Sequence, residues 1–402
     1  MGYTRRGMLA LGGVGLAGAW VQGSRPDPRG PAVPMGHAAE ASALGIPNER
    51  FMLSAPGGTE ALLRGLADAT RRRQFAMGLP ASAEPLLDKQ ILALSGGGEN
   101  GAFGAGLLTG WTAQGTRPTF HIVSGVSVGA LIAPFAFIGP SRDAELRELF
   151  TTMTADQVMR RRGWIDGVVG ESLADNAPLM DTIARHLDAG MMEDIARGHE
   201  EGRVLLVGTV NLDAQAAVWW NLGAIAASGH PGALALMREI LLASAAIPGL
   251  FPPSMIDVTL GGRRFQEMHV DGGALAQTFV YPSALGEKRR ARIREGLPVP
   301  QAAAYVICNT RLSGARPPVG LWTVSIAERA IAALIRANGL GDVWRIYQNA
   351  ERDGIGFNLA VIGDDFAPMP QARFDRDYMR ALFTHAEDQA RRGYPWMHSP
   401  PV

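Results

Sequence analysis

The chain has 402 residues, of which 47% are hydrophobic and 19% charged, values that are ordinary for a globular enzyme. Its formal net charge is zero, which excludes the basic excess that typically draws a protein to nucleic acid. The single cysteine, Cys308, cannot form an intrachain disulfide, and its apolar neighbours predict a buried strand. The fold must therefore depend on packing alone.

Residues 1–22 have the layout of an export signal. Arg5 and Arg6 precede a short stretch rich in Gly, Ala and Leu, shorter than the roughly 20 apolar residues that span a bilayer. The order Thr-Arg-Arg-Gly-Met-Leu over 4–9 is similar to a twin-arginine signal. We therefore expect a periplasmic or secreted protein, with an uncleaved N-terminal membrane anchor or a disordered arm as alternatives.

Residues 23–88 are expected to precede the main domain. Pro, Gly and Ala are abundant over 23–44, which predicts a linker. Apolar residues at helical spacing over 60–73 then predict a helix laid against the main domain. The main domain is expected over 89–402, with its core at 89–285.

A glycine cluster follows an apolar run of strand length at 90–95. Gly96, Gly97 and Gly98 lead into a helical run that begins at Ala102. Glycines at a strand-to-helix turn let backbone N–H groups converge on a phosphate or on the oxyanion of an acyl-transfer intermediate. The spacing fits neither a Walker loop nor a dinucleotide fingerprint, so no nucleotide cofactor is expected.

A candidate nucleophile lies in the next turn. Gly125-Val-Ser127-Val-Gly129 stands between a predicted strand and an apolar helix. Such a sharp turn exposes a serine hydroxyl at a helix N-terminus, and small flanking residues allow the strand and helix to approach closely. The alternative is a plain tight turn.

A candidate base ends a later strand. Asp271 is followed by Gly272 and Gly273, an arrangement that fits either an active-site acid or a common Asp-Gly turn. His269 precedes Asp271 by two residues, so both side chains are expected on one face of the strand. His269 is therefore either a neighbour of the site or a core histidine.

Glycine loop, serine elbow and Asp-Gly-Gly occur in an order that resembles the patatin-like phospholipase family, from Lys89 to Gly273. The resemblance implies an α/β fold of three α/β/α layers around a central, mostly parallel sheet, and a Ser–Asp dyad without metal. It implies Ser127 as nucleophile, Asp271 as base and the three loop glycines as the oxyanion hole. One position departs from the family: Asn100 stands where Arg or Lys is common. An amide carries no positive charge, so this loop is not expected to bind an anionic phosphate as a basic residue would.

The expected function is lipid acyl hydrolysis on a lipid or other acyl-ester substrate, with peripheral membrane contact as a further hypothesis. Alternatives are a non-phospholipid esterase, thioesterase or acyltransferase, and a non-catalytic lipid-binding protein. A triad would need His385 or His398, the two histidines after Asp271. A dyad predicts a pH profile without an inflection near 6.5. The sequence does not indicate an oligomeric state.

Four further elements are expected. Short helices over the active-site mouth are predicted between 140 and 203, and a charged loop at 287–297. An amphipathic helix over 324–337 is predicted to pack on the core, and a strand at 357–362. The histidines are scattered, and no metal-ligand cluster is evident.

Overall fold

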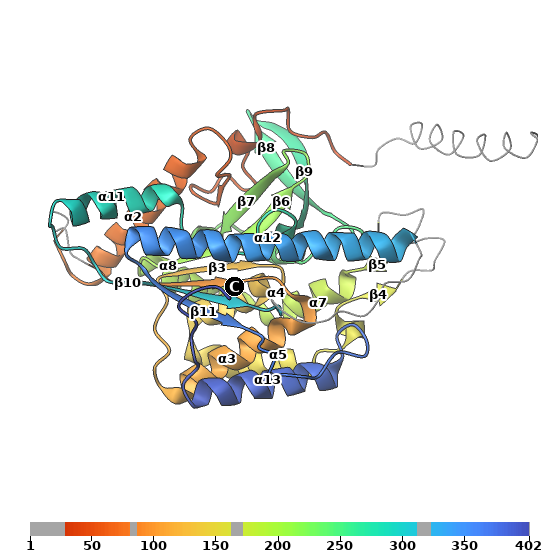
Figure 1. Cartoon of the computed structure of the whole chain (residues 1–402). Helices are drawn as coiled ribbons and strands as arrows, with labels where there is room; N and C mark the ends of the chain where they lie inside the picture. Colours follow the sequence, from red (N-terminus) through yellow and green to blue (C-terminus); the bar gives the residue numbers. More distant parts are fainter. Residues whose placement is uncertain (1–28, 81–86, 162–171, 312–322, 402) are drawn as a thin grey trace, which may run out of the picture.

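The computed structural model describes residues 29–80, 87–161, 172–311 and 323–401. The expected export signal lies outside these residues. A nine-stranded sheet forms the centre of the molecule (Figure 1). Its main path is β1-β7-β6-β3-β2-β10-β11; β9 pairs with β6 and with β8. The strands are β1 (Arg50–Phe51), β2 (Lys89–Leu94), β3 (Ile122–Val126), β6 (Val204–Asn211), β7 (Ala216–Asn221), β8 (Ser254–Leu260), β9 (Arg263–Asp271), β10 (Ala302–Cys308) and β11 (Gly356–Val361).

Five of these strands, β2, β3, β6, β10 and β11, run parallel. This confirms the predicted mostly parallel sheet. Cys308 is buried at the end of β10, and β11 is the strand predicted near the C-terminus. Parallel strands place their carboxyl ends at one edge of the sheet, which is where the candidate site forms.

Helices cover both faces of the sheet. Alternate side chains of β2 enter two separate hydrophobic cores, with Leu92 and Leu94 in one and Ile91 and Ala93 in the other. The first core contains α3 (Gly101–Gln114), α4 (Val128–Ile138), α5 (Asp143–Thr152), α7 (Ala177–His186), α8 (Ala189–Glu200), α9 (Leu222–Ala226), α10 (Ala233–Ser244) and α13 (Arg376–Arg391). The second contains α2 (Gly58–Ala76), the predicted early helix, and part of α12 (Thr323–Asp353). The three predicted α/β/α layers are therefore present.

Short elements complete the described chain. A small sheet pairs β4 (Arg160–Arg161) with β5 (Ala174–Asp175). Single 3-10 turns are η1 (Ala38–Glu40), η2 (Gly98–Asn100), η3 (Pro140–Arg142), η4 (Ala155–Gln157) and η5 (Gly272–Ala274). Turn η2 begins at Gly98, the last glycine of the loop, and turn η5 follows β9 directly.

The segment at 29–44 is not a free linker. Arg29 forms an ion pair of 2.8 Å with Asp213, and Ser42 forms a β-bridge with Thr259 of β8. Ala41 is buried in the first core. Backbone pairing rather than apolar burial holds most of this segment, which is why its composition suggested a linker.

The charged segment at 287–297 is largely helical, so the loop predicted there is wrong. It lies in α11 (Ser283–Arg294). Arg289 donates from Nε to the Asp353 carbonyl oxygen at 2.8 Å, and Arg290 pairs with the Asp353 carboxylate. Polar contacts to the end of α12 stabilise this helix, and such contacts leave no hydrophobic periodicity in the sequence.

The helix predicted over 324–337 exists, but it does not pack on the core there. It is the first half of the 31-residue α12, which crosses the front of the molecule in Figure 1. Leu334 is 66% exposed and Ile326 48% exposed. Core packing begins only near Val343 and Ile346. In the part of the chain that the structure describes, no helix is long and apolar enough to cross a bilayer.

Candidate active site

Ser127 lies on a strained turn between β3 and α4. Its backbone angles are φ 56° and ψ −127°, which a non-glycine residue adopts only when its surroundings force it. A Cβ on Gly125 would lie 2.3 Å from the Gly129 carbonyl oxygen, and a Cβ on Gly129 would lie 2.3 Å from that of Leu94. The predicted close approach of strand and helix is therefore present. It sets Ser127 at the N-terminus of α4, as a nucleophile elbow requires.

A residue that sequence reasoning missed, Ser244, holds this turn. Its hydroxyl accepts the Ser127 backbone N–H at 3.0 Å and donates to the Gly208 carbonyl oxygen at 2.7 Å. Ser244 is the last residue of α10 and is fully buried. Only the three-dimensional contact reveals this role, because no spacing in the sequence relates residues 127 and 244.

The topology of β6 explains how Asp271 reaches Ser127. Strand β3 pairs with β6 up to the pair Val126–Gly208, and β9 continues with the pair Asp271–Thr209. The two strands thus share one edge of β6 and meet end to end. The Ser127 side chain approaches the Asp271 carboxyl and favours its ionised form, and that carboxyl also accepts the Gly273 N–H at 2.8 Å.

Burial tunes the Asp271 carboxyl towards a base. Asp271 is only 2% exposed, and this burial raises the pKa of its carboxyl to about 6. Ser127 and the Gly273 N–H have the opposite effect and lower this pKa, but burial is the larger influence. A carboxylate with a raised pKa is a stronger proton acceptor, and it is ionised above pH 6.

The glycine loop lies against the nucleophile. A Cβ on Gly96 would be 3.1 Å from the Ser127 Cβ, and one on Gly97 would be 2.0 Å from the Asn309 carbonyl oxygen. Asn309, fully buried after β10, braces the loop: its N–H donates to the Ser95 hydroxyl at 2.9 Å. The loop glycines, including Gly98 at φ +59°, therefore leave room that larger residues would fill.

The stretch that carries these three features matches a known family. A family model described as patatin-like phospholipase covers residues 92–282. Residues 92–282 belong to the patatin-like phospholipase family. The proteins of this family are lipid acyl hydrolases, and the match extends over residues 92–282 of the chain.

Other comparisons with known proteins are less informative about this patatin-like domain. No curated protein matches the chain in sequence. Among 11 solved chains that match is the crystal structure of VipD from Legionella pneumophila. It is 12% identical, with a TM-score of 0.38 over 77% of this chain and 67% of VipD.

Asn100 of the patatin-like domain serves a structural contact. Its Oδ1 accepts a hydrogen bond of 2.6 Å from the Tyr378 hydroxyl on α13. The position that is commonly basic in the family thus ties the glycine loop to a helix of the first core. An uncharged amide in this contact contributes no positive charge to the site.

His269 shares the buried side of β9 with Asp271, as its position predicted, but neither ring nitrogen is free. Nδ1 is 2.9 Å from the Thr209 hydroxyl and Nε2 is 3.1 Å from Glu267. The ring is fully buried, and burial lowers its pKa. His269 therefore lies beside the dyad without being the base of a triad.

The two later histidines have partners away from the dyad. His398 Nδ1 lies 3.0 Å from the Phe357 carbonyl oxygen. Phe357 is at the amino end of β11, so His398 lies at the opposite edge of the sheet from Ser127. His385 pairs with Asp365 at 3.2 Å and its ring lies 5.2 Å from that of Phe366. Among the described residues, no group of three or more His, Cys, Asp or Glu side chains could hold a metal.

Replacing His385 or His398 by Ala should leave turnover within about threefold of wild type, because neither contacts the dyad.

The pH dependence of activity should differ from the one that the sequence predicted. Because the Asp271 pKa is raised to about 6, the pH profile should have an inflection near 6. Activity should rise as pH increases through 6, since the ionised carboxylate is the active form. Both histidine variants should keep that inflection; a loss of several orders of magnitude in either would favour a triad.

A small, mostly apolar cavity of about 20 Å³ lies between α4, α7 and α10, and one of its lining residues, Leu131, follows Ser127 by one helical turn. Helix α7 is one of the short helices predicted between 140 and 203. The lining includes Leu131, Pro134, Phe135, Leu179, Ile183 and Leu241. Its composition suits an aliphatic chain better than a polar group.

Proposed function

We propose that the protein is a lipid acyl hydrolase that cleaves carboxylic esters through an acyl-Ser127 intermediate, with Asp271 as the base. One observation carries the proposal. A strained, buried serine lies at a helix N-terminus beside the buried carboxyl of Asp271, because β3 and β9 meet end to end on β6. Backbone strain at such a position costs about 1–3 kcal/mol and is typical of functional turns.

The reaction begins when Asp271 accepts the Ser127 hydroxyl proton and the oxygen attacks the ester carbonyl carbon. Backbone N–H groups of Gly97 and Gly98 stabilise the tetrahedral oxyanion, an effect of about 3–4 kcal/mol per donor. The C–O bond to the alcohol breaks as Asp271 returns the proton to the departing oxygen. Water, deprotonated by Asp271, then attacks the acyl-serine. The bond to Ser127 Oγ breaks as Asp271 returns the proton to that oxygen, which releases the carboxylic acid and restores Ser127.

The apolar lining of the cavity beside Leu131 favours an aliphatic acyl group, for which this cavity of about 20 Å³ would have to widen. Asn100, which brings no charge, favours a non-phospholipid ester as the alternative substrate. Hydrolysis of p-nitrophenyl esters of graded chain length, compared with phosphatidylcholine vesicles, tests both. Preference for long chains and vesicles supports a lipid substrate, and preference for acetate or butyrate supports the smaller ester. No turnover of either would favour the non-catalytic lipid-binding alternative.

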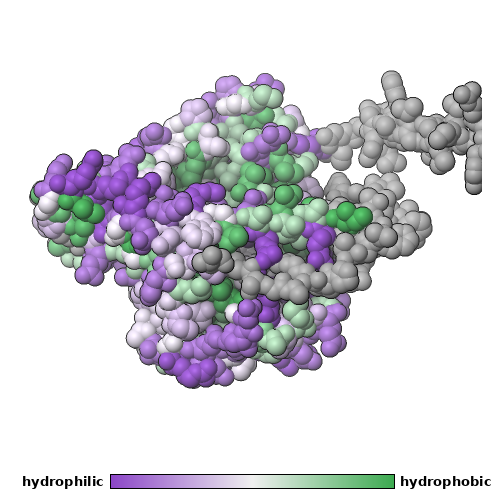
Figure 2. Space-filling view, in the orientation of Figure 1, coloured by the Kyte–Doolittle hydropathy of each residue, from purple (hydrophilic) through white to green (hydrophobic). Residues whose placement is uncertain are grey.

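We also propose that the first half of α12 contacts the membrane surface. Figure 2 shows apolar residues gathered along this helix, and Leu275, four residues after Asp271, is 48% exposed. Asn338 of α12 donates to the Ala274 carbonyl oxygen at 3.3 Å, which ties the helix to the segment that follows the catalytic strand. A helix lying in the membrane surface would therefore bring lipid to the site.

Replacing Ile326 and Leu334 together by Asp should reduce hydrolysis of phospholipid vesicles about tenfold or more, because two large apolar side chains no longer enter the bilayer. Hydrolysis of a soluble short-chain ester should change little. Phe75→Asp is the matched control, since Phe75 on α2 is 87% exposed. Equal loss in that control, or unchanged vesicle hydrolysis in the α12 variant, would contradict membrane contact through α12.

Export by a twin-arginine route is a further proposal. It is supported by Arg5 and Arg6 ahead of a short apolar stretch. Cells that express the wild-type chain should export it, and cells that express the Arg5→Lys, Arg6→Lys double variant should retain that variant in the cytoplasm, as cell fractionation measures. Export of the double variant would contradict this route.

A further inference from the structure

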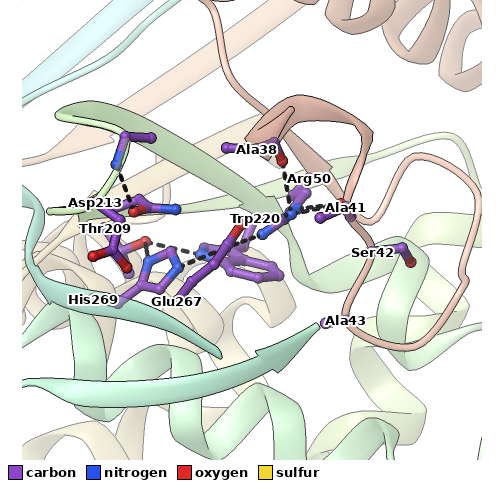
Figure 3. A network of polar contacts seen from close by, with 12 residues as sticks. Ala38, Ala41, Ser42, Ala43, Arg50, Thr209, Asp213, Trp220, Glu267 and His269 are labelled. Atoms are coloured by element: carbon purple, nitrogen blue, oxygen red, sulfur yellow. Dashed lines mark hydrogen bonds and ion pairs between the residues drawn. The ribbon is translucent and has the colours of Figure 1, made fainter. Parts of the chain in front are cut away.

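A buried polar chain runs from β1 to the catalytic end of β9 (Figure 3). Arg50 Nη1 donates to Glu267 Oε2 at 2.6 Å, and the same oxygen lies 3.1 Å from His269 Nε2. His269 Nδ1 lies 2.9 Å from the Thr209 hydroxyl, which also receives the Trp220 Nε1–H at 2.9 Å. The side chains of Glu267 and His269 are fully buried, and that of Arg50 is 5% exposed.

The fixed donors set the direction of two bonds in this chain, and the neutral form of His269 sets the direction of the others. Indole N–H and guanidinium groups can only donate. Thr209 Oγ1 therefore accepts from Trp220 and has its own proton free to give to His269 Nδ1. That leaves the His269 proton on Nε2, where Glu267 accepts it. All groups are satisfied when His269 is the neutral Nε2–H tautomer.

The chain ends beside the proposed base. Thr209 pairs directly with Asp271 across β6 and β9. Side chains of such a pair share one face of the sheet, with Cβ atoms about 4.5–5.5 Å apart. The Asp271 carboxyl is approached by the Ser127 side chain and accepts the Gly273 N–H. The Thr209 hydroxyl, its neighbour on the sheet, gives its proton to His269 instead.

We propose that His269, kept neutral by its burial and by the charge of Arg50, is a positioning residue that holds the Thr209 hydroxyl proton away from Asp271. The inference rests on the proposed role of Asp271 as base. An additional donor to an ionised carboxylate favours its charged form and makes it a weaker base. Diverting this proton thus preserves the basicity that burial gives to Asp271.

Burial is the main cause that lowers the His269 pKa, and the charge of Arg50 lowers it further. Glu267 raises this pKa, and so does Asp213, which is paired with Arg29 at 2.8 Å. Trp220, whose ring lies 5.6 Å from that of His269, is uncharged. Removing the charge of Arg50 leaves Glu267 to favour imidazolium. Its Nδ1–H would then donate to Thr209 and turn the hydroxyl proton towards Asp271.

The test is the pH dependence of kcat/KM on a soluble p-nitrophenyl ester. In Arg50→Met and in His269→Phe, the acid inflection should move down by about 0.5 pH unit or more, because Thr209 now donates to Asp271. Arg50→Lys keeps the charge and should keep the wild-type inflection. Adding Thr209→Val to either shifted variant should return the inflection to its wild-type pH.

The pH at which kcat/KM has its acid inflection does not depend on the fraction of protein that is folded. A partial loss of stability would therefore lower the rate without shifting this pH. Arg50→Met, at the far end of the chain, covers the case in which His269→Phe does not fold. An unmoved inflection in Arg50→Met, or a shift that Thr209→Val does not reverse, would overturn the inference. Wild-type activity that survives Asp271→Asn would instead overturn the proposed function itself.

Discussion

Ser127→Ala and Asp271→Asn should each lower ester turnover by a factor on the order of 10⁴ or more. The alanine variant has no oxygen to form the acyl-enzyme. The asparagine variant keeps the shape of the side chain but cannot accept the serine proton. Initial rates on p-nitrophenyl butyrate at pH 8 measure both losses. Activity within tenfold of wild type in either variant would contradict the dyad.

Stability separates lost chemistry from lost folding in Asp271→Asn. Burial raises the Asp271 pKa from 3.8 to about 6, so the ionised carboxylate is less favourable in the folded chain than in the unfolded chain. This cost is fully present above pH 6 and disappears below 3.8. Asn should therefore stabilise the protein by up to about 3 kcal/mol at pH 8 and by little at pH 3.5. Urea unfolding at both pH values measures the difference.

Gly97→Ala should lower kcat by about 10²–10³-fold, the usual loss when an oxyanion donor is displaced. The new Cβ would meet the Asn309 carbonyl oxygen at 2.0 Å, and backbone cannot move aside as a flexible side chain can. The loop must shift, and its N–H groups shift with it. Single-turnover kinetics on the same ester measure the chemical step directly.

Gly115→Ala is the matched control for that loop variant. Gly115 ends α3 at φ +86° with open space around it, so Ala there costs only about 1 kcal/mol of backbone strain. Its turnover should equal wild type. If Gly97→Ala also keeps wild-type turnover, the loop does not carry the oxyanion hole.

The sequence predicted the parts of the site that local patterns encode. The glycines around Ser127, the glycine loop and the Asp271 turn each follow or precede a recognisable strand, and their order suggested one family. What the sequence could not predict is how Asp271 meets Ser127. That depends on β3 and β9 sharing one edge of β6, a long-range pairing without a local signal.

Other misses have the same physical origin. Ser244 and Asn309 brace the site through hydrogen bonds to residues that are distant in the sequence, and such contacts leave no periodic pattern. The segment at 29–44 is held by backbone pairing and ion pairs, so its Pro- and Gly-rich composition indicated a linker. The apolar residues at helical spacing over 324–337 predict the first half of α12, and that prediction is confirmed. Their spacing alone does not predict whether this face of the helix contacts the core or the solvent.

Covalent labelling is the direct test of Ser127 as the nucleophile. The native protein is treated with a fluorophosphonate at pH 8, digested, and its peptides are mapped by mass spectrometry. One phosphonylated site is expected, Ser127, with labelling slowed strongly in Asp271→Asn and absent in Ser127→Ala. Labelling at another serine, or equal labelling of Ser127→Ala, would contradict Ser127 as the nucleophile.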